Sequence, residues 1–262
     1  MADDFFWYEL MTPDQAASER FYTKVVEWTA AAQGMNDGHG NPYVVVSVGA
    51  RGIGGLFQLT DEMQAGGARP GWVGYVHVAD VDARVKAIIE AGGTQTMPPT
   101  EIPGVGRFAM VADPGGAPFY VMTPKPAPGA EPGPMPAPGT AGTCGWRELF
   151  SSLGEKEAFD FYAAQFGWES VGEFDMGGTM GIYRLWGHDG EQLGGMMKKP
   201  DNIPMSVWNF YFMVDGIDAA IGRLEEAGGQ VTNGPHQVPG GQWIVQGTDP
   251  QGAHFALLSA TR

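Results

Sequence analysis

The sequence predicts an α+β protein made of four βαβββ modules, paired into two domains with curved mixed sheets. The chain repeats itself across its midpoint, and each half repeats the order of one strand, one helix and further strands. One module has too little core to fold alone, whereas two can curl their strands into a shared cup with helices outside. A Pro/Ala/Gly-rich segment, 124–142, is predicted to be an extended linker. We therefore expect one domain over 1–123 and another over 143–262, each with two modules.

The duplication is visible residue by residue. The opening FFWYELMTPD returns as CGWRELFSSL, so that Trp7 corresponds to Trp146 and Glu9 to Glu148. Further matches follow with only small changes of spacing. They include Phe21-Tyr22 with Phe161-Tyr162, Trp28 with Trp168, Tyr43 with Tyr183, Gly54-Gly55 with Gly194-Gly195, Trp72 with Trp208, and Asp113-Pro114 with Asp249-Pro250.

The elements of the first half follow from periodicity. Residues 5–11 form a short apolar run, and 13–28 carries apolar residues at helical spacing after the capping sequence Thr12-Pro13-Asp14. The second module opens with a strand over 72–80 and continues with a helix over 81–93 that glycine ends. The remaining predicted strands are 42–49, 53–59, 107–113 and 117–123.

Composition excludes several classes of protein. The net charge of −15 comes from acids spread along the chain, whereas nucleic-acid binding favours a clustered basic face. A single cysteine, Cys144, fits a reducing compartment. The start has no basic region followed by an apolar run, and no apolar stretch reaches about 18 residues. We expect a cytoplasmic protein that binds neither nucleic acid nor membrane.

These motifs resemble the vicinal oxygen chelate superfamily, which holds glyoxalase, extradiol dioxygenases and bleomycin-resistance proteins. The likeness rests on the FY pair in each first helix, AGG after each second helix and DPxG before each last strand. Trp-x-Glu-Leu with two fused halves is most similar to two-domain glyoxalase-like bacterial proteins, some of them labelled hydroxylase or lyase. The resemblance implies a divalent metal in each cup, held by His, Gln or Glu on the first and last strands of the modules. Such a metal polarises vicinal oxygens of a substrate.

The residues at those positions do not match a metal site. The first half has Trp7, Val73, Tyr120 and Gln58 there, and the second has Trp146, Asn209, Ala256 and Lys198. Indole, valine, alanine and an ammonium group do not ligate Mg, Zn or Fe. We therefore expect no metal cofactor. A displaced site of Glu9, His77 and Gln58 is the alternative, although the second half offers Glu148, Met213 and Lys198 instead.

Several residues are candidates for ligand contact because strand alternation places them on the cup faces. They are Trp7, Glu9, Gln58, Tyr75, His77, Tyr120, Trp146, Glu148, Lys198, Asn209 and Tyr211.

Some of these residues and their neighbours can also have purely structural roles. A lone histidine on an apolar strand favours a structural role for His77 over ligand contact, and Tyr43 and Tyr183 are expected only to pack. The paired glycines at 54–55 and 194–195 indicate bulges or close backbone approach. The carboxylates of Glu9 and Glu148 need a partner if they lie in an aromatic cup. Lys198 is one candidate partner for Glu148, and backbone donors, water, a protonated state of the acid and a cationic ligand are the alternatives.

Three functions are consistent with these residues. The first is a binder of a small organic molecule, aromatic or cationic, in aromatic cups without the usual metal. The second is a metal-dependent lyase, isomerase or oxygenase with a displaced site. The third is a degenerate paralogue that acts through protein contacts. Four modules in one chain make a monomer or a weak homodimer the expected state.

Overall fold

A computed structural model describes residues 3–36, 40–129 and 132–262 and confirms the α+β class. The first half contains, in order, β1 (Phe5–Thr12), α1 (Gln15–Val25), β2 (Thr29–Asn36), β3 (Pro42–Val48), β4 (Arg51–Gln58), α2 (Asp61–Ala65), β5 (Gly71–His77), α3 (Val81–Glu90), β6 (Thr94–Ile102), β7 (Gly106–Ala112) and β8 (Pro118–Pro124). The βαβββ order therefore occurs twice, as the periodicity predicts. The short helix α2 has no counterpart in the predicted elements.

The second half repeats this order without the short helix. Its elements are β9 (Cys144–Ser151), α4 (Glu155–Phe166), β10 (Glu169–Asp175), β11 (Ile182–His188), β12 (Glu191–Lys198), β13 (Val207–Met213), α5 (Ile217–Glu226), β14 (Gln230–Gln237), β15 (Trp243–Thr248) and β16 (His254–Ser259). None of the helices in the described ranges has the length and hydropathy that crossing a bilayer requires.

Each half contributes one eight-stranded mixed sheet. The strand orders are β2-β3-β4-β1-β5-β8-β7-β6 and β10-β11-β12-β9-β13-β16-β15-β14. In both sheets the first strand of a module pairs in parallel with the last strand of that module, while the three later strands pair in antiparallel fashion. The two sheets are thus two copies of one topology.

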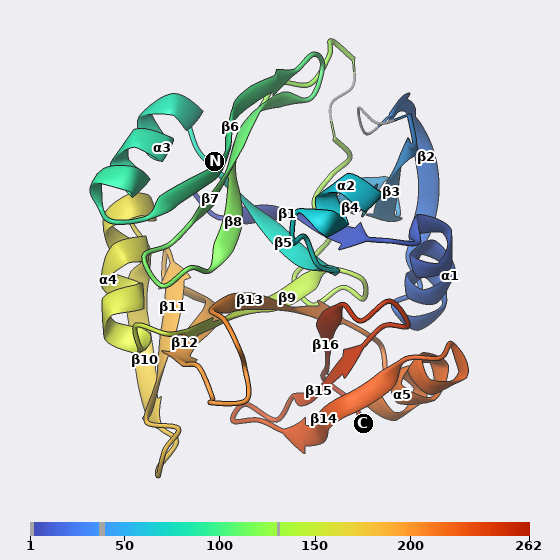
Figure 1. Cartoon of the computed structure of the whole chain (residues 1–262). Coiled ribbons are helices and arrows are strands. Elements are labelled where there is room, and N and C mark those ends of the chain that lie inside the picture. Colours follow the sequence, from blue (N-terminus) through green and yellow to red (C-terminus); the bar gives the residue numbers. More distant parts are fainter. Residues whose placement is uncertain (1–2, 37–39, 130–131) are drawn as a thin grey trace. The chain divides into compact units, whose positions relative to one another are not determined.

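Packing groups the modules across the sequence halves. One compact unit, called unit 1 below, consists of 3–6, 73–129 and 146–209; unit 2 consists of 7–36, 40–72, 132–145 and 210–262. Figure 1 shows α3 beside α4 in unit 1 and α1 near α5 in unit 2. The sequence left open whether modules pair within or between halves, and these units pair them between halves. The domain boundaries 1–123 and 143–262 stay a prediction about the duplicated sequence.

A buried chain of hydrogen bonds joins the two modules of unit 2. The indole Nε1 of Trp72 donates to the Tyr22 hydroxyl at 2.9 Å, and that hydroxyl donates to Oδ2 of Asp249 at 3.2 Å. The other carboxylate oxygen of Asp249 accepts the backbone N–H groups of Gln251 and Ala253 at 2.9 and 2.8 Å. Tyr22 lies on α1 and Asp249 in the turn before β16, so this Trp–Tyr–Asp relay ties the first module to the fourth.

Unit 1 contains a second copy of the Trp–Tyr–Asp relay. Trp208 donates to the Tyr162 hydroxyl at 2.9 Å, and Tyr162 donates to Asp113 at 3.2 Å. The N–H of Ala117 donates to the other oxygen of Asp113 at 2.8 Å. Both tyrosines are 0% exposed. The repeated FY and Asp-Pro motifs therefore hold the modules of each unit together.

Aromatic rings fill the core around both relays. In unit 1, Trp168 stacks on Tyr162 with centroids 5.1 Å apart and on Trp186 at 3.9 Å. In unit 2, Phe212 meets Trp28 and Trp72 edge-on at 4.8 and 4.9 Å. Buried aromatic pairs contribute about 0.5–1.5 kcal/mol each beyond the area they bury. The Phe212 contacts therefore add to the coupling between modules, whereas the Trp168 stack stabilises the interior of one module.

The second part of the Pro-rich segment packs on unit 2. The Trp28 indole donates to the carbonyl oxygen of Gly142 at 2.7 Å, and Arg51 donates to that of Gly133 at 3.2 Å. The N–H of Gly142 donates to the Met213 carbonyl at 2.8 Å. This stretch of the linker is therefore anchored through its backbone instead of serving only as a spacer.

Replacing Tyr22 or Tyr162 with Phe should lower the free energy of unfolding by about 1–3 kcal/mol in each case. Either change leaves a buried indole N–H and a buried carboxylate oxygen without the hydroxyl between them. Urea unfolding followed by circular dichroism measures the effect. Thr100→Val removes an exposed hydroxyl and should change stability by less than about 0.5 kcal/mol. Unchanged stability in both tyrosine variants would contradict the coupling role.

Stability should also depend on pH through Asp249. Burial raises the pKa of this carboxyl above its ordinary 3.8, against the opposing effect of its hydrogen-bond donors. The folded state therefore favours the neutral acid, and the contribution of Asp249 to stability is full below pH 3.8 and falls as pH rises through the folded-state pKa. Asp249→Asn removes this titration. The unfolding free energy of the parent minus that of the variant should fall as pH rises above 3.8 through the folded-state pKa; a difference that rises with pH would refute this.

Candidate functional site

Three neighbouring strands of unit 2 bring Trp7, Glu9 and Tyr43 together. Trp7 and Glu9 are alternate residues of β1 and so share one face of the sheet. The Trp7 indole N–H donates to the Tyr43 hydroxyl at 3.1 Å, and Tyr43 donates to Oε2 of Glu9 at 2.8 Å. Glu9 is 5% exposed. Tyr43 was expected only to pack; instead it is a hydrogen-bond partner of this buried carboxylate, and the three residues form a Trp–Tyr–Glu relay.

Glycine makes this relay possible. Strand β4 lies between β3 and β1, and Gly55 pairs with Val45 on one side and Glu9 on the other. A Cβ atom on Gly55 would overlap the Tyr43 hydroxyl. The phenol therefore crosses β4 over a residue without a side chain. The register also shifts between Val46 and Ser47, so both predicted reasons for the glycine pair, a bulge and a close approach, apply.

The second half repeats the Trp–Tyr–Glu relay within unit 1. Trp146 donates to the Tyr183 hydroxyl at 2.9 Å, and Tyr183 donates to Oε1 of Glu148 at 2.9 Å. Glu148 is 7% exposed, and a Cβ on Gly195 would overlap the Tyr183 ring. The observed partner of Glu148 is thus Tyr183, whereas the Lys198 side chain is exposed. The packing-only role expected for Tyr183 was therefore wrong, and Lys198 as a partner of Glu148 stays a prediction.

The phenol of this second relay keeps its proton. Burial of the hydroxyl raises the pKa of Tyr183 well above 10, and the charge of Glu148 raises it further. The indole hydrogen bond lowers it by a smaller amount. Tyr183 is therefore a fixed donor to Glu148 across the physiological range, and the direction of the relay runs from tryptophan through tyrosine to the acid.

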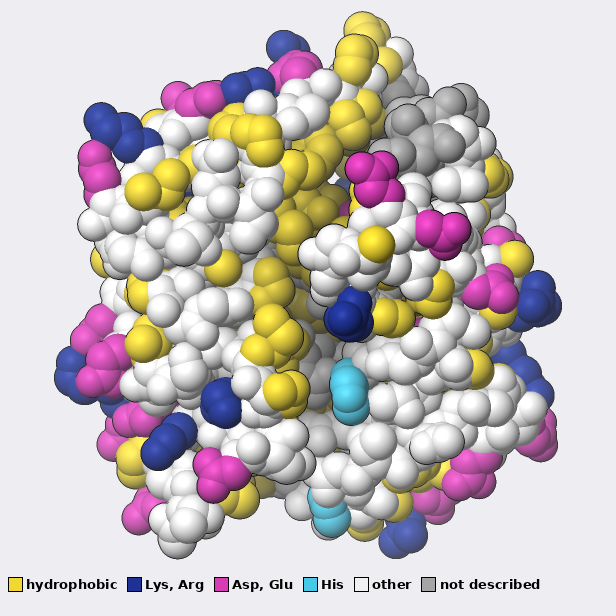
Figure 2. All heavy atoms as spheres, in the orientation of Figure 1, with side chains coloured by type: hydrophobic (Ala, Val, Ile, Leu, Met, Phe, Trp, Pro, Cys, Tyr) yellow, Lys and Arg dark blue, Asp and Glu magenta, His cyan; other side chains and the backbone are white. Residues whose placement is uncertain are grey.

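Two other predicted ligand residues stack on each other in unit 1. Tyr75 and Tyr120 are paired residues of β5 and β8, with ring centroids 4.2 Å apart and planes at 14°. Phe108 on β7 lies 6.3 and 6.0 Å from them. Figure 2 shows hydrophobic side chains gathered in the upper half of the view. Tyr75 and Tyr120 are buried, at 6% and 5% exposed, and contact of either with a ligand stays a prediction.

The side-chain amide of Gln58 holds the turn before α1. Its Oε1 accepts the N–H of Gln15 at 2.9 Å, and its Nε2 donates to the carbonyls of Pro13 and Leu59 at 2.7 and 3.1 Å. These bonds give Gln58 a structural role, and a ligand contact would compete with them.

His77 and Glu9, the centre of the displaced metal site, have different partners. The Nδ1 atom of His77 lies 3.6 Å from Oδ1 of Asp3, and its ring meets Phe6 edge-on at 6.3 Å. Glu9 bonds to Tyr43. Among the residues that the structure describes, no three His, Cys, Asp or Glu side chains are arranged to hold a metal ion.

The last two predicted residues lie on β13. Tyr211 is buried in unit 2, where its hydroxyl accepts Nε2 of Gln246 at 2.7 Å. Asn209 is half-buried in unit 1. Sequence reasoning missed Gln246, Tyr43 and Tyr183. The two tyrosines had a usable signal, since both copies retain a hydroxyl near a glycine pair.

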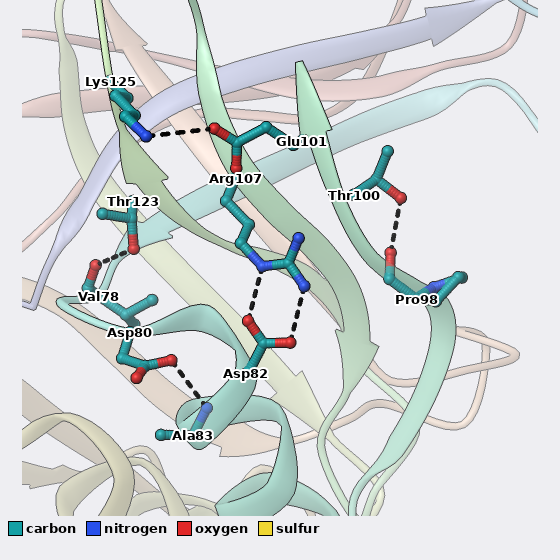
Figure 3. Close-up of polar contacts among 10 residues, drawn as sticks. All are labelled: Val78, Asp80, Asp82, Ala83, Pro98, Thr100, Glu101, Arg107, Thr123 and Lys125. Atoms are coloured by element: carbon teal, nitrogen blue, oxygen red, sulfur yellow. Dashed lines mark hydrogen bonds and ion pairs between the residues drawn. The ribbon is translucent and has the colours of Figure 1, made fainter. Parts of the chain in front are cut away.

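A charged hollow of about 220 Å³ lies beside α3 and is a weak candidate for a site. Figure 3 shows its polar groups bound to one another: Arg107 forms two bonds to Asp82 at 2.6 and 2.7 Å, and Lys125 lies 3.7 Å from Glu101. Because these charges are already paired with each other, the hollow has little charge left to offer a ligand.

Comparison with known sequences identifies the family. The sequence profile of the Glyoxalase/Bleomycin resistance protein/Dioxygenase superfamily matches residues 5–121 and again 156–257. The chain belongs to this superfamily. The resemblance inferred from the motifs is therefore confirmed, as is the internal duplication.

Two relatives of this superfamily match almost the whole chain. The candidate glyoxylase CFP32 of Mycobacterium bovis is 31% identical over 258 residues, which are 96% of this chain and 93% of that protein. The anthracycline biosynthesis protein DnrV of Streptomyces peucetius is 30% identical over 262 residues, 96% of this chain and 91% of DnrV.

Solved structures of the superfamily share the fold at much lower identity. The 2,3-dioxygenase LapB of Pseudomonas sp. KL28 has a TM-score of 0.66 at 13% identity and covers 99% of this chain and 92% of its own. A Mn(II)-bound glyoxalase of Novosphingobium aromaticivorans has a TM-score of 0.63 at 15% identity, covering 100% and 83%. At these identities the likeness establishes the fold alone.

The glycine beneath each tyrosine gives a direct test of the relay geometry. Gly55→Ala should lower the free energy of unfolding by about 1–3 kcal/mol, because the new methyl group overlaps the Tyr43 hydroxyl. Gly71→Ala is the matched control, since its Cβ would meet open space. In a Tyr43→Ala background the Gly55 substitution should cost less, which a double-mutant cycle measures. Equal costs in both backgrounds would show that the tyrosine does not depend on this glycine.

Proposed function

We propose that this protein binds a small planar aromatic molecule on the aromatic faces of its sheets, without the metal that the superfamily commonly uses. The observation that carries the proposal is the duplicated Trp–Tyr–Glu relay. It stands on the opening strands β1 and β9, where the resemblance to the superfamily implies a metal-binding histidine.

The chemistry of the donor set supports the proposal. At the opening-strand position an indole replaces a ligating side chain, and its nitrogen carries a proton that it donates to tyrosine. The side-chain amide of Gln58 is already hydrogen-bonded to backbone groups, and Lys198 carries a positive charge. Such residues do not fit a divalent ion. We therefore derive no metal-dependent step.

The exposed aromatic surface supports the ligand class. Trp7, Tyr43, Trp146 and Tyr183 are partly exposed although their polar atoms are hydrogen-bonded. Each aromatic stacking contact contributes about 0.5–1.5 kcal/mol beyond burial of area. The name of the Streptomyces relative connects that protein with anthracyclines, which are fused-ring aromatic compounds; a ligand of this shape would suit indole and phenol faces.

A panel of planar polycyclic compounds, screened by thermal shift and followed by calorimetry, tests this function. We expect at least one compound to raise the melting temperature and to bind with a dissociation constant in the micromolar range. The double variant Trp7→Ala/Trp146→Ala should weaken this binding about tenfold. Trp243→Ala is the control, because this indole on β15 lies against Arg262 at 4.9 Å and belongs to neither relay.

Two results would overturn the proposal. One is a complete panel without any shift of the melting temperature. The other is stoichiometric metal in protein purified without chelator, together with glyoxalase or extradiol dioxygenase activity that rises with added Mn, Ni, Zn or Fe. The second result would establish the metal-dependent enzyme instead.

A further inference from the structure

The protein contains two kinds of Trp–Tyr–acid relay that differ in exposure. In the Trp–Tyr–Asp relays both rings are buried: Tyr22 and Tyr162 are 0% exposed, and Trp72 and Trp208 are 6% and 3% exposed. In the Trp–Tyr–Glu relays the acids are as deeply buried, at 5% and 7%, yet the rings remain partly exposed. A purely structural relay has no need of accessible rings, so the second kind has surface left for a ligand.

The direction of the hydrogen bonds determines what this surface attracts. Each tryptophan donates its N–H to tyrosine, and each tyrosine donates its O–H to a glutamate carboxylate. Hydrogen bonds in a chain polarise one another, and the effect is greater where the local dielectric is low. A ring that donates its proton toward a negative charge gains electron density on its face. The partly exposed rings of each relay therefore become richer in electron density.

A negative aromatic face backed by a buried carboxylate is a receptor for an organic cation. We infer that each Trp–Tyr–Glu relay binds an ammonium group of the ligand, seated on the tryptophan and tyrosine faces, with the charge balanced by Glu9 or Glu148 behind the phenol. The ligand class is then a planar aromatic body that carries a protonated or quaternary amine. This inference rests on the proposed function and specifies its ligand.

Three features of the chain are consistent with a cationic ligand. The net charge of −15 attracts cations at long range. Burial raises the pKa of Tyr183, which keeps the phenol protonated, so the negative charge stays on the Glu148 carboxylate behind the ring. The same three residue types with the same bond directions occur in both halves, so the chain should hold two such positions.

A pair of isosteric probes tests the inference on the full-length protein. Both carry the same acridine body; one ends in a trimethylammonium group and the other in a tert-butyl group of equal shape. Calorimetry should show that the cation binds about tenfold more tightly than the neutral probe. The double variant Glu9→Gln/Glu148→Gln should abolish this preference while the affinity for the neutral probe changes less than about twofold. Glu62→Gln removes one exposed acid and should leave the preference intact.

The possible results separate the inference from the proposed function. Equal affinities of the two probes for the parent protein overturn the inference, although binding of the neutral probe still supports an aromatic ligand. Failure of both probes to bind counts against both. Circular dichroism reports whether the double variant folds; if it does not, the comparison of the two probes on the parent protein decides by itself.

Discussion

The packing of the modules depends on a hydrogen bond to a buried aspartate. One carboxylate oxygen of this aspartate receives its donor from a neighbouring module. Asp249 accepts two backbone N–H groups from its own turn, but its remaining oxygen receives the hydroxyl of Tyr22 from another module. Leaving such an oxygen unpaired costs about 1–3 kcal/mol. Asp113 and Tyr162 impose the same condition in unit 1. Each module therefore contains one half of a hydrogen bond that only a partner module completes.

The same chemistry is used again where the sheets present aromatic faces. There the acid is Glu9 or Glu148, and the tyrosine reaches it across a neighbouring strand of the same module. This reach needs a residue without a side chain beneath the phenol, which explains why glycine stands at 55 and 195. A carboxylate that would otherwise be unfavourable in an apolar sheet is thus satisfied locally, and the rings that satisfy it remain accessible.

Much of the fold follows from the sequence, because apolar periodicity and glycine-ended helices are local signals. The four modules, the opening strands and the helices α1 and α3 were all predicted on this basis. The pairing of modules was not, since a duplicated chain offers Tyr22 two equivalent acids, Asp113 and Asp249, and spacing alone does not distinguish them. The role of Tyr43 escaped prediction for a related reason: its contact with Glu9 depends on the register of three strands, β3, β4 and β1.

The tryptophan on the opening strand offers a cation a different kind of contact from the one that a histidine would offer. A histidine offers a nitrogen lone pair in the plane of its ring, whereas the indole nitrogen offers a proton in that plane and electron density only above and below it. Trp7 and Trp146 both direct that proton to tyrosine. A bare metal ion therefore finds no ligand at this position, while a large, weakly hydrated organic cation can approach the ring face. The organic cation that we propose would thus meet aromatic faces at the position where the resemblance to the superfamily implies metal coordination.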